Sequence, residues 1–168
     1  MDMKAFNDLP ADAAKKIIED ACHSPIVGQK IADLRPFQDF SALLDACDVQ
    51  WFNLPDDQVL LTLEHHPKIG DLESLRKKYA AVAEQAKTEQ GKMGEASEET
   101  LADLKKYNEL YEKKHSFRFM VCATGKAPEE MLAIMQDRIG NSSLIELRQA
   151  SVEQAKITRL RLQKVISA

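Results

Sequence analysis

The amino-acid sequence predicts an all-α protein, a single compact, bundle-like domain of seven to eight helices. Apolar residues recur every three or four positions along almost the whole chain, as they do on the buried face of a helix. Proline, serine and acidic residues stand where these stretches begin. A chain of 168 residues suits one hydrophobic core, so we expect one domain over residues 1–168.

Each predicted helix has a start signal, an apolar face or both. Pro10 suits the first turn of one helix, with Asn7 or Asp8 as its cap. Ser24 and Ser97 are candidate caps of two later helices, since a serine side chain can accept a hydrogen bond from the first turn. The predicted helices cover residues 10–21, 24–32, 37–47, 54–64, 72–86, 97–114, 128–139 and 143–166.

The apolar run at residues 117–122 has the composition of a strand. A single short strand cannot form a sheet. We therefore expect a short buried segment, helical or extended, that ends at Gly125.

Composition and charge exclude several classes of protein. Acidic residues (27) outnumber basic residues (23), which argues against a general nucleic-acid binder, although a small anion needs only one or two cations. The sequence contains no apolar run long enough for a membrane span and no signal peptide, so we expect a soluble, cytoplasmic protein. The three widely spaced cysteines predict buried free thiols, and Met93, Met120, Met131 and Met135 predict core packing.

The known nucleotide and hydrolase motifs are missing from the sequence. It contains no G-x-G-x-x-G, no phosphate-binding Gly-Lys-Ser/Thr loop and no G-x-S-x-G. The sequence therefore does not support a nucleotide-dependent enzyme or a serine hydrolase.

The adjacent histidines His65 and His66 precede Pro67 at a predicted helix end. Histidine is the side chain best suited to proton transfer near neutral pH. The alternative is a surface helix terminus, where a histidine interacts favourably with the helix dipole. A metal site is a weaker interpretation, because adjacent histidines point in different directions on a helix and no H-x-x-x-H spacing exists.

Two other groups of polar residues allow a functional or a plain structural interpretation. Glu84-Gln85 and Glu89-Gln90 are each compatible with an ordinary helix surface. Arg159 and Arg161 lie two residues apart and hence on different faces of the last helix. A half-buried arginine needs an anionic ligand or a salt bridge, and both remain open for this pair.

Taken together, these segments resemble the family of 2-oxo-4-hydroxy-4-carboxy-5-ureidoimidazoline (OHCU) decarboxylases. Each piece is weak alone, but their order and spacing are specific. The resemblance covers nearly the whole chain, in Leu9-Pro10, Arg35-Pro36-Phe37, His66-Pro67-Lys68-Ile69-Gly70, Glu89-Gln90, Leu104, Asn108, Tyr111, Phe117-Arg118-Phe119-Met120-Val121-Cys122-Ala123, Arg138-Ile139-Gly140-Asn141, Glu146, Ala150, Glu153, Ile157 and Arg161-Leu162.

The resemblance implies decarboxylation of OHCU to (S)-allantoin and CO2 in urate degradation, without a metal or another cofactor. The implied partner is the small ureide substrate, not a nucleic acid or a membrane, and the implied assembly is a homodimer. His66, Glu89 and Arg161 correspond to the family's catalytic residues. The implied substrate-binding residues are Pro67, Ala86, Gln90, Phe119, Met120, Val121, Cys122 and Ala123.

Ala86 departs from the family pattern, which usually has serine three residues before the glutamate. The missing hydroxyl removes a substrate hydrogen bond worth roughly 0.5–1.5 kcal/mol. This departure motivates an alternative, a non-catalytic helical module that binds a ureide or a partner protein. Another alternative keeps the same site for an enzyme that acts on a related ureido-imidazole or hydantoin.

Overall fold

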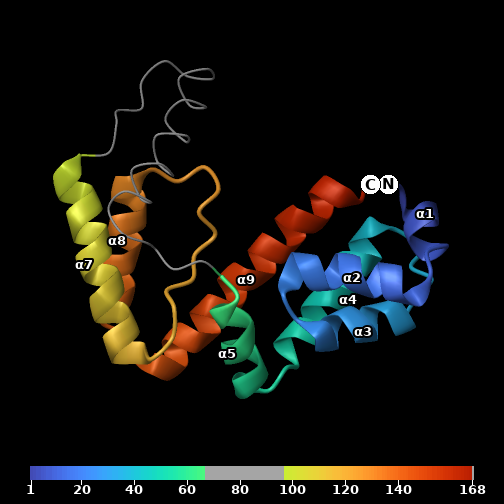
Figure 1. Ribbon diagram of the computed structural model, residues 1–168, viewed down its shortest axis with the longest axis horizontal. Helices are drawn as coiled ribbons and strands as arrows, with labels where there is room; N and C mark the ends of the chain where they lie inside the picture. The colour runs from blue at the N-terminus through green and yellow to red at the C-terminus, as the bar shows by residue number, and fades with distance from the viewer. Residues whose placement is uncertain (67–96, 168) are drawn as a thin grey trace, which may run out of the picture. The chain divides into compact units, whose positions relative to one another are not determined.

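The structure, a computed structural model, describes residues 1–66 and 97–167. The predicted helix at residues 72–86 lies outside these ranges. The described residues form eight helices and no strand (Figure 1), which confirms the all-α prediction. The helices are α1 (Met3–Asn7), α2 (Ala11–Cys22), α3 (Pro25–Asp33), α4 (Phe40–Phe52), α5 (Asp56–Glu64), α7 (Glu98–His115), α8 (Pro128–Arg138) and α9 (Ser143–Val165).

The chain divides into two compact units. The first unit comprises Met1–His65, Met120–Cys122 and Leu147–Ala168. The second unit comprises His66–Phe119 and Ala123–Glu146. Helix α9 therefore begins in the second unit and contributes most of its length to the first.

The first unit is built on the packing of α2 against α3 and of α3 against α4. Gly28 permits the close approach of α2 and α3, because a Cβ atom there would lie 3.0 Å from the carbonyl oxygen of Lys15. The two chain ends lie side by side (Figure 1), since the amino group of Met1 donates to the Val165 carbonyl at 2.7 Å. The largest fully buried side chains of this unit are Phe6, Ile18, Ile31, Leu43, Leu63, Leu162 and Ile166.

The second unit is built on α7 and α8, which pack side by side (Figure 1). Its largest fully buried side chains are Leu101, Leu104, Tyr111, Met131 and Met135. Two of the methionines expected in the core therefore lie there. Met120 is also buried, in the first unit, and Met93 lies outside the described residues.

Most predicted helix starts agree with the structure. Ser24 caps α3 by accepting a hydrogen bond from the Val27 amide at 3.3 Å. Ser97 caps α7 through the Thr100 amide at 3.0 Å. These starts were predictable because a cap depends on residues only three positions apart.

The predicted caps of α2 were wrong. Its N-cap is Pro10, and Asn7 and Asp8 instead end α1, a five-residue helix that the sequence did not predict. The Asn7 side-chain amide binds the backbone of Phe37, with hydrogen bonds of 2.8 Å and 2.9 Å to its carbonyl and N–H. The helix predicted from Phe37 therefore starts three residues later, as α4 at Phe40 after its cap Asp39.

The three cysteines are buried and free, as expected. Burial raises the pKa of Cys22 to about 11 and that of Cys47 to about 12, so both thiols are neutral at neutral pH. Within the described part of the chain, no helix is long and apolar enough to cross a membrane.

Candidate functional site

His65 and His66 differ in exposure at the end of α5. His65 is the C-cap of that helix and is exposed, whereas His66 is buried, with 7% of its surface accessible. The guanidinium of Arg118 donates a hydrogen bond to the carbonyl oxygen of His66. A surface helix terminus therefore describes His65 and not His66.

Residues 117–122 form neither a helix nor a strand. Phe119, Met120 and Cys122 are buried, while Val121 and Ala123 are half-buried. Because this segment is neither a helix nor a strand, its backbone groups lack a regular ladder of hydrogen bonds, and those that are buried need other partners.

Glu153 supplies one such partner within the first unit. Its Oε2 atom accepts a hydrogen bond from the backbone N–H of Cys122 at 2.8 Å, and its Oε1 atom accepts one from Lys156 at 2.6 Å. Glu153 is buried, with 6% of its surface accessible. The resemblance assigned Cys122 to substrate binding, but its backbone N–H is thus bound by the protein itself.

A buried polar network fixes Phe119 within the second unit. The Arg138 guanidinium lies 4.6 Å from the centre of the Phe119 ring, and the Tyr111 ring meets the same ring edge-on at 5.0 Å. Glu146 accepts hydrogen bonds from Arg138, Asn141 and Tyr111. Burial by itself raises the pKa of Glu146, but these hydrogen bonds outweigh it and lower the pKa overall.

Arg159 and Arg161 of α9 have different partners, as their spacing predicted. Arg159 forms ion pairs with Asp48 at 2.6 Å and with Asp45 at 3.4 Å, which is the salt-bridge interpretation. Arg161 is half-buried and donates through Nη1 to the Ala21 carbonyl at 3.0 Å and to His23 Nε2 at 2.7 Å. Within the described ranges, no carboxylate pairs with Arg161.

His23 contacts both Arg161 and His65. It is the C-cap of α2, and its ring lies 6.0 Å from the ring of His65 at an interplanar angle of 28°. Burial lowers the pKa of His23, and the charges of Arg161 and His65 lower it further. His23 is therefore neutral at neutral pH, and its Nε2 atom can accept a hydrogen bond.

The structure describes seven of the eleven predicted site residues. His66, Phe119 and Ala123 belong to the second unit, and Met120, Val121, Cys122 and Arg161 belong to the first. The other four lie outside the described residues, namely Pro67, Ala86, Glu89 and Gln90, and so does the competing pair Glu84-Gln85.

Sequence reasoning assigned no role to four groups that hold the predicted site residues: His23, Arg118, Glu153 and the Arg138–Glu146 pair. A signal existed for the two glutamates. They are seven residues apart on α9, in phase with the fully buried Ala150, and an acid on a buried helix face needs a partner. The contact of His23 with Arg161 spans 138 residues, and no local pattern indicates it.

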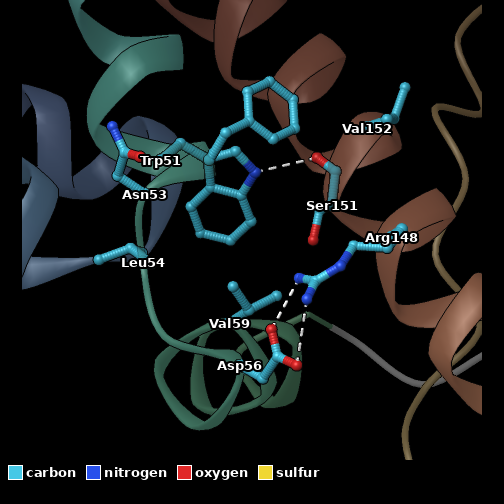
Figure 2. Close-up of a pocket in the computed structure, with 9 residues that line it drawn as sticks. Trp51, Asn53, Leu54, Asp56, Val59, Arg148, Ser151 and Val152 are labelled. Carbon is cyan, nitrogen blue, oxygen red and sulfur yellow. Dashed lines mark hydrogen bonds and ion pairs between the residues drawn. The ribbon is translucent and has the colours of Figure 1, made fainter.

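A cavity of about 450 Å³ lies elsewhere in the first unit, between the end of α4, the start of α5 and α9 (Figure 2). The Trp51 indole N–H donates to the Ser151 carbonyl at 2.9 Å beside it, and Arg148 pairs with Asp56 at 2.7 Å. None of the predicted site residues that the structure describes lines this cavity. Its contacts connect α4 and α5 to α9.

Comparison with known proteins identifies the family. A family model described as OHCU decarboxylase matches residues 7–163. The uric acid degradation bifunctional protein TTL of Arabidopsis thaliana is 32% identical over 151 residues, which are 87% of this chain and 45% of that protein. The 2-oxo-4-hydroxy-4-carboxy-5-ureidoimidazoline decarboxylase of Haloferax volcanii is 29% identical over 162 residues, 96% of this chain and 92% of that one.

Solved structures agree with this result. The crystal structure of an OHCU decarboxylase in the presence of (S)-allantoin matches with a TM-score of 0.70 and 30% identity, over 89% of this chain and 96% of that chain. The crystal structure of an (S)-allantoin synthase shares the fold, with a TM-score of 0.78 at 17% identity, over 99% of this chain and 54% of that chain. The present chain therefore belongs to the OHCU decarboxylase family.

Proposed function

We propose that this protein decarboxylates OHCU to (S)-allantoin and CO2 and is thus a carbon–carbon lyase of urate degradation. The observation that carries the proposal is the family match over residues 7–163. It is supported by the relative from Haloferax volcanii, of which this chain covers 92%, and by the related decarboxylase that was solved in the presence of (S)-allantoin.

The reaction breaks the bond between the carboxylate carbon and the ring carbon that bears it. CO2 leaves, and the electron pair of that bond enters the neighbouring imine group of the ring, whose nitrogen takes up a proton to give an enol. The enol hydroxyl then loses its proton and becomes the ring carbonyl, while the adjacent carbon, which bears the ureido group, gains a proton. The protein has to orient the carboxylate, stabilise the developing charge and deliver the proton to one face.

Three side chains carry these tasks in the proposal. His66 transfers the proton, Glu89 orients the ureido and ring N–H groups, and Arg161 binds the negative charge. The half-buried position of Arg161, with no paired carboxylate among the described residues, supports its role, because a guanidinium in that environment favours an anionic ligand.

The remaining predicted residues shape the substrate site in the proposal. Gln90 and the backbone of residues 119–123 recognise the paired donors and acceptors of the ureide, with Pro67 and Ala86 beside them. The Glu153 contact limits this role at Cys122 to its carbonyl group, since its N–H is already bound. The buried side chains of Phe119, Met120 and Cys122 supply apolar surface, which strengthens nearby polar contacts.

The protein is further proposed to act as a cytoplasmic homodimer in which each chain works as one domain, without a metal or another cofactor. Nucleic acids and membranes are not expected partners. Light scattering tests the assembly, with a mass of two chains expected and a mass of one chain contradicting it. A single cooperative transition in urea, with the same midpoint by circular dichroism and by Trp51 fluorescence, is expected for one domain.

Substrate competition and variants test the function. Freshly generated OHCU is supplied, and chiral allantoin is followed by circular dichroism above the spontaneous rate. Hydantoins and other ureido-imidazoles are expected to be slower substrates than OHCU, and a faster one would replace OHCU as the substrate. Binding of a ureide without product would favour the non-catalytic module. Full activity of His66→Ala would refute the role of His66.

A further inference from the structure

His23 adopts a backbone conformation that is unusual for a residue with a side chain. Its φ and ψ angles are 58° and 21°, in the left-handed region that glycine normally occupies at the C-terminal end of a helix. Its N–H still closes the last turn of α2 by donating to the Glu19 carbonyl at 2.6 Å. Glycine would make the same turn with less strain, so the histidine side chain itself needs an explanation.

The side chain of His23 contacts the arginine that the proposed function assigns to the substrate. Arg161 Nη1 lies 2.7 Å from His23 Nε2 and 3.0 Å from the Ala21 carbonyl oxygen. A guanidinium only donates, so Nε2 must be the acceptor and the imidazole carries its proton on Nδ1. Both hydrogens of Nη1 are then used by α2 and its cap.

This arrangement sets the orientation of the guanidinium. Within the described part of the chain, Arg161 Nε and Nη2 meet no acceptor. These two nitrogens form one edge of the guanidinium, and that edge fits a carboxylate with two parallel hydrogen bonds. His23 and Ala21 therefore hold the opposite corner and leave the binding edge for an anion.

We propose that His23 is a positioning residue for Arg161. Its neutral imidazole, together with the Ala21 carbonyl, holds Nη1 so that the Nε–Nη2 edge binds the anionic group of the substrate, and protonation of His23 releases this hold. The proposal rests on the proposed function, because it assigns Arg161 to the substrate.

The charged and titratable groups around His23 determine how acid acts on it. Among the described residues, Arg161 faces it from α9, His65 faces it from the end of α5, and Asp20 precedes it on α2. Burial, Arg161 and His65 lower the pKa of His23, whereas Asp20 raises it to a smaller degree. The imidazole is thus neutral at neutral pH, and the hydrogen bond is lost as the pH falls through the lowered pKa.

Three variants separate positioning from helix capping. His23→Gly relieves the left-handed strain but removes the acceptor. His23→Asn tolerates the same conformation, keeps an acceptor oxygen and does not titrate. Ser116→Gly is the matched control, because Ser116 is the C-cap of α7 at φ 63° and is not among the hydrogen-bond partners of Arg161 in the described part of the chain.

With OHCU as substrate, we expect a loss of activity in His23→Gly that the other two variants do not show. His23→Gly lowers kcat/KM about tenfold, in line with the loss of one hydrogen bond to a charged group. His23→Asn stays within about threefold of the wild type at pH 7.5 and retains a larger share of that activity at pH 5.5. Ser116→Gly is unchanged. Equal activity of His23→Gly and the wild type, or the same pH profile for His23→Asn and the wild type, overturns the proposal.

A titration independent of activity distinguishes this proposal from the proposed function. The pKa of His23 is measured by nuclear magnetic resonance in the wild type and in Arg161→Met. Removal of the guanidinium is expected to raise it, and an unchanged value overturns the contact. If the wild type does not turn over OHCU but the pKa rises, the contact stands and the proposed function fails.

Discussion

The buried carboxylate of Glu146 allows a quantitative prediction of stability. It accepts hydrogen bonds from Arg138 Nη2 at 2.8 Å and Nε at 3.0 Å, from Tyr111 at 2.6 Å and from Asn141 at 2.7 Å. The Glu146 side chain is fully buried, and only 10% of the Arg138 side chain is exposed. Glu146→Ala would leave the Arg138 charge buried without this carboxylate.

The expected cost follows from that burial. Breaking a buried ion pair by removing one partner lowers the free energy of unfolding by about 3–5 kcal/mol. Glu146→Gln keeps an acceptor oxygen but loses the charge, so we expect it to lower the free energy of unfolding by about 1.5–3 kcal/mol. The double variant Glu146→Leu with Arg138→Met is expected to recover part of the loss, because it leaves no buried charge.

An exposed pair provides the matched control. Asp56 and Arg148 form the same type of ion pair at 2.7 Å (Figure 2), with 46% and 58% of their side chains exposed. Solvent screens such a pair, so Asp56→Ala is expected to cost about 1 kcal/mol or less. Urea unfolding followed by far-ultraviolet circular dichroism measures both variants. Equal losses for Glu146→Ala and Asp56→Ala would refute this reasoning.

Three further predictions concern pH, packing and the segment at residues 117–122. Burial is the main cause that lowers the pKa values of His23 and His115. The stability that these neutral histidines contribute is therefore fully present above their ordinary pKa of 6.5 and is lost as the pH falls through the lowered values. Urea midpoints at pH 7.5, 6.5 and 5.5 test this, and a constant midpoint contradicts it. Gly28→Ala is expected to lower the free energy of unfolding by about 1–3 kcal/mol, because its Cβ meets the Lys15 carbonyl oxygen at 3.0 Å. A Cβ at Gly140 meets open space, so the stability of Gly140→Ala is expected to stay near that of the wild type. Thermal unfolding compares the two variants. Glu153→Ala removes the acceptor of the Cys122 N–H, so it is expected to lower the free energy of unfolding by about 1–3 kcal/mol and to lower kcat/KM for OHCU. Glu153→Gln is expected to recover both. Unchanged stability and activity in Glu153→Ala would rule this role out.

The sequence predicted those parts of the fold that depend on neighbouring residues. Ser24 and Ser97 predict the starts of α3 and α7, because each serine accepts a hydrogen bond from an amide three residues away. Helix α1 escaped prediction, since five residues with one buried side chain, Phe6, show no period. The start of α4 was misplaced because Phe37 is held by Asn7, thirty residues earlier in the chain.

The candidate site shows the same difference between local patterns, which the sequence reveals, and contacts between distant residues, which it does not. His66 and Arg161 were named from a motif, and the structure adds the groups that hold them, Arg118 at the His66 carbonyl and His23 at the guanidinium. These contacts join residues 52 and 138 positions apart, which no pattern of period two or 3.6 encodes. The buried polar face of α9 was predictable from the sequence, because Glu146 and Glu153 lie on the same helix face as the buried Ala150.

The rate of (S)-allantoin formation from fresh OHCU is the most direct test of the proposed decarboxylase activity. Circular dichroism records the appearance of one enantiomer while the spontaneous reaction yields no excess of either. We expect a rate well above the spontaneous background for the wild type, and a rate near that background for His66→Ala. A wild-type rate equal to the background, with the protein folded, would show that this protein is not an OHCU decarboxylase.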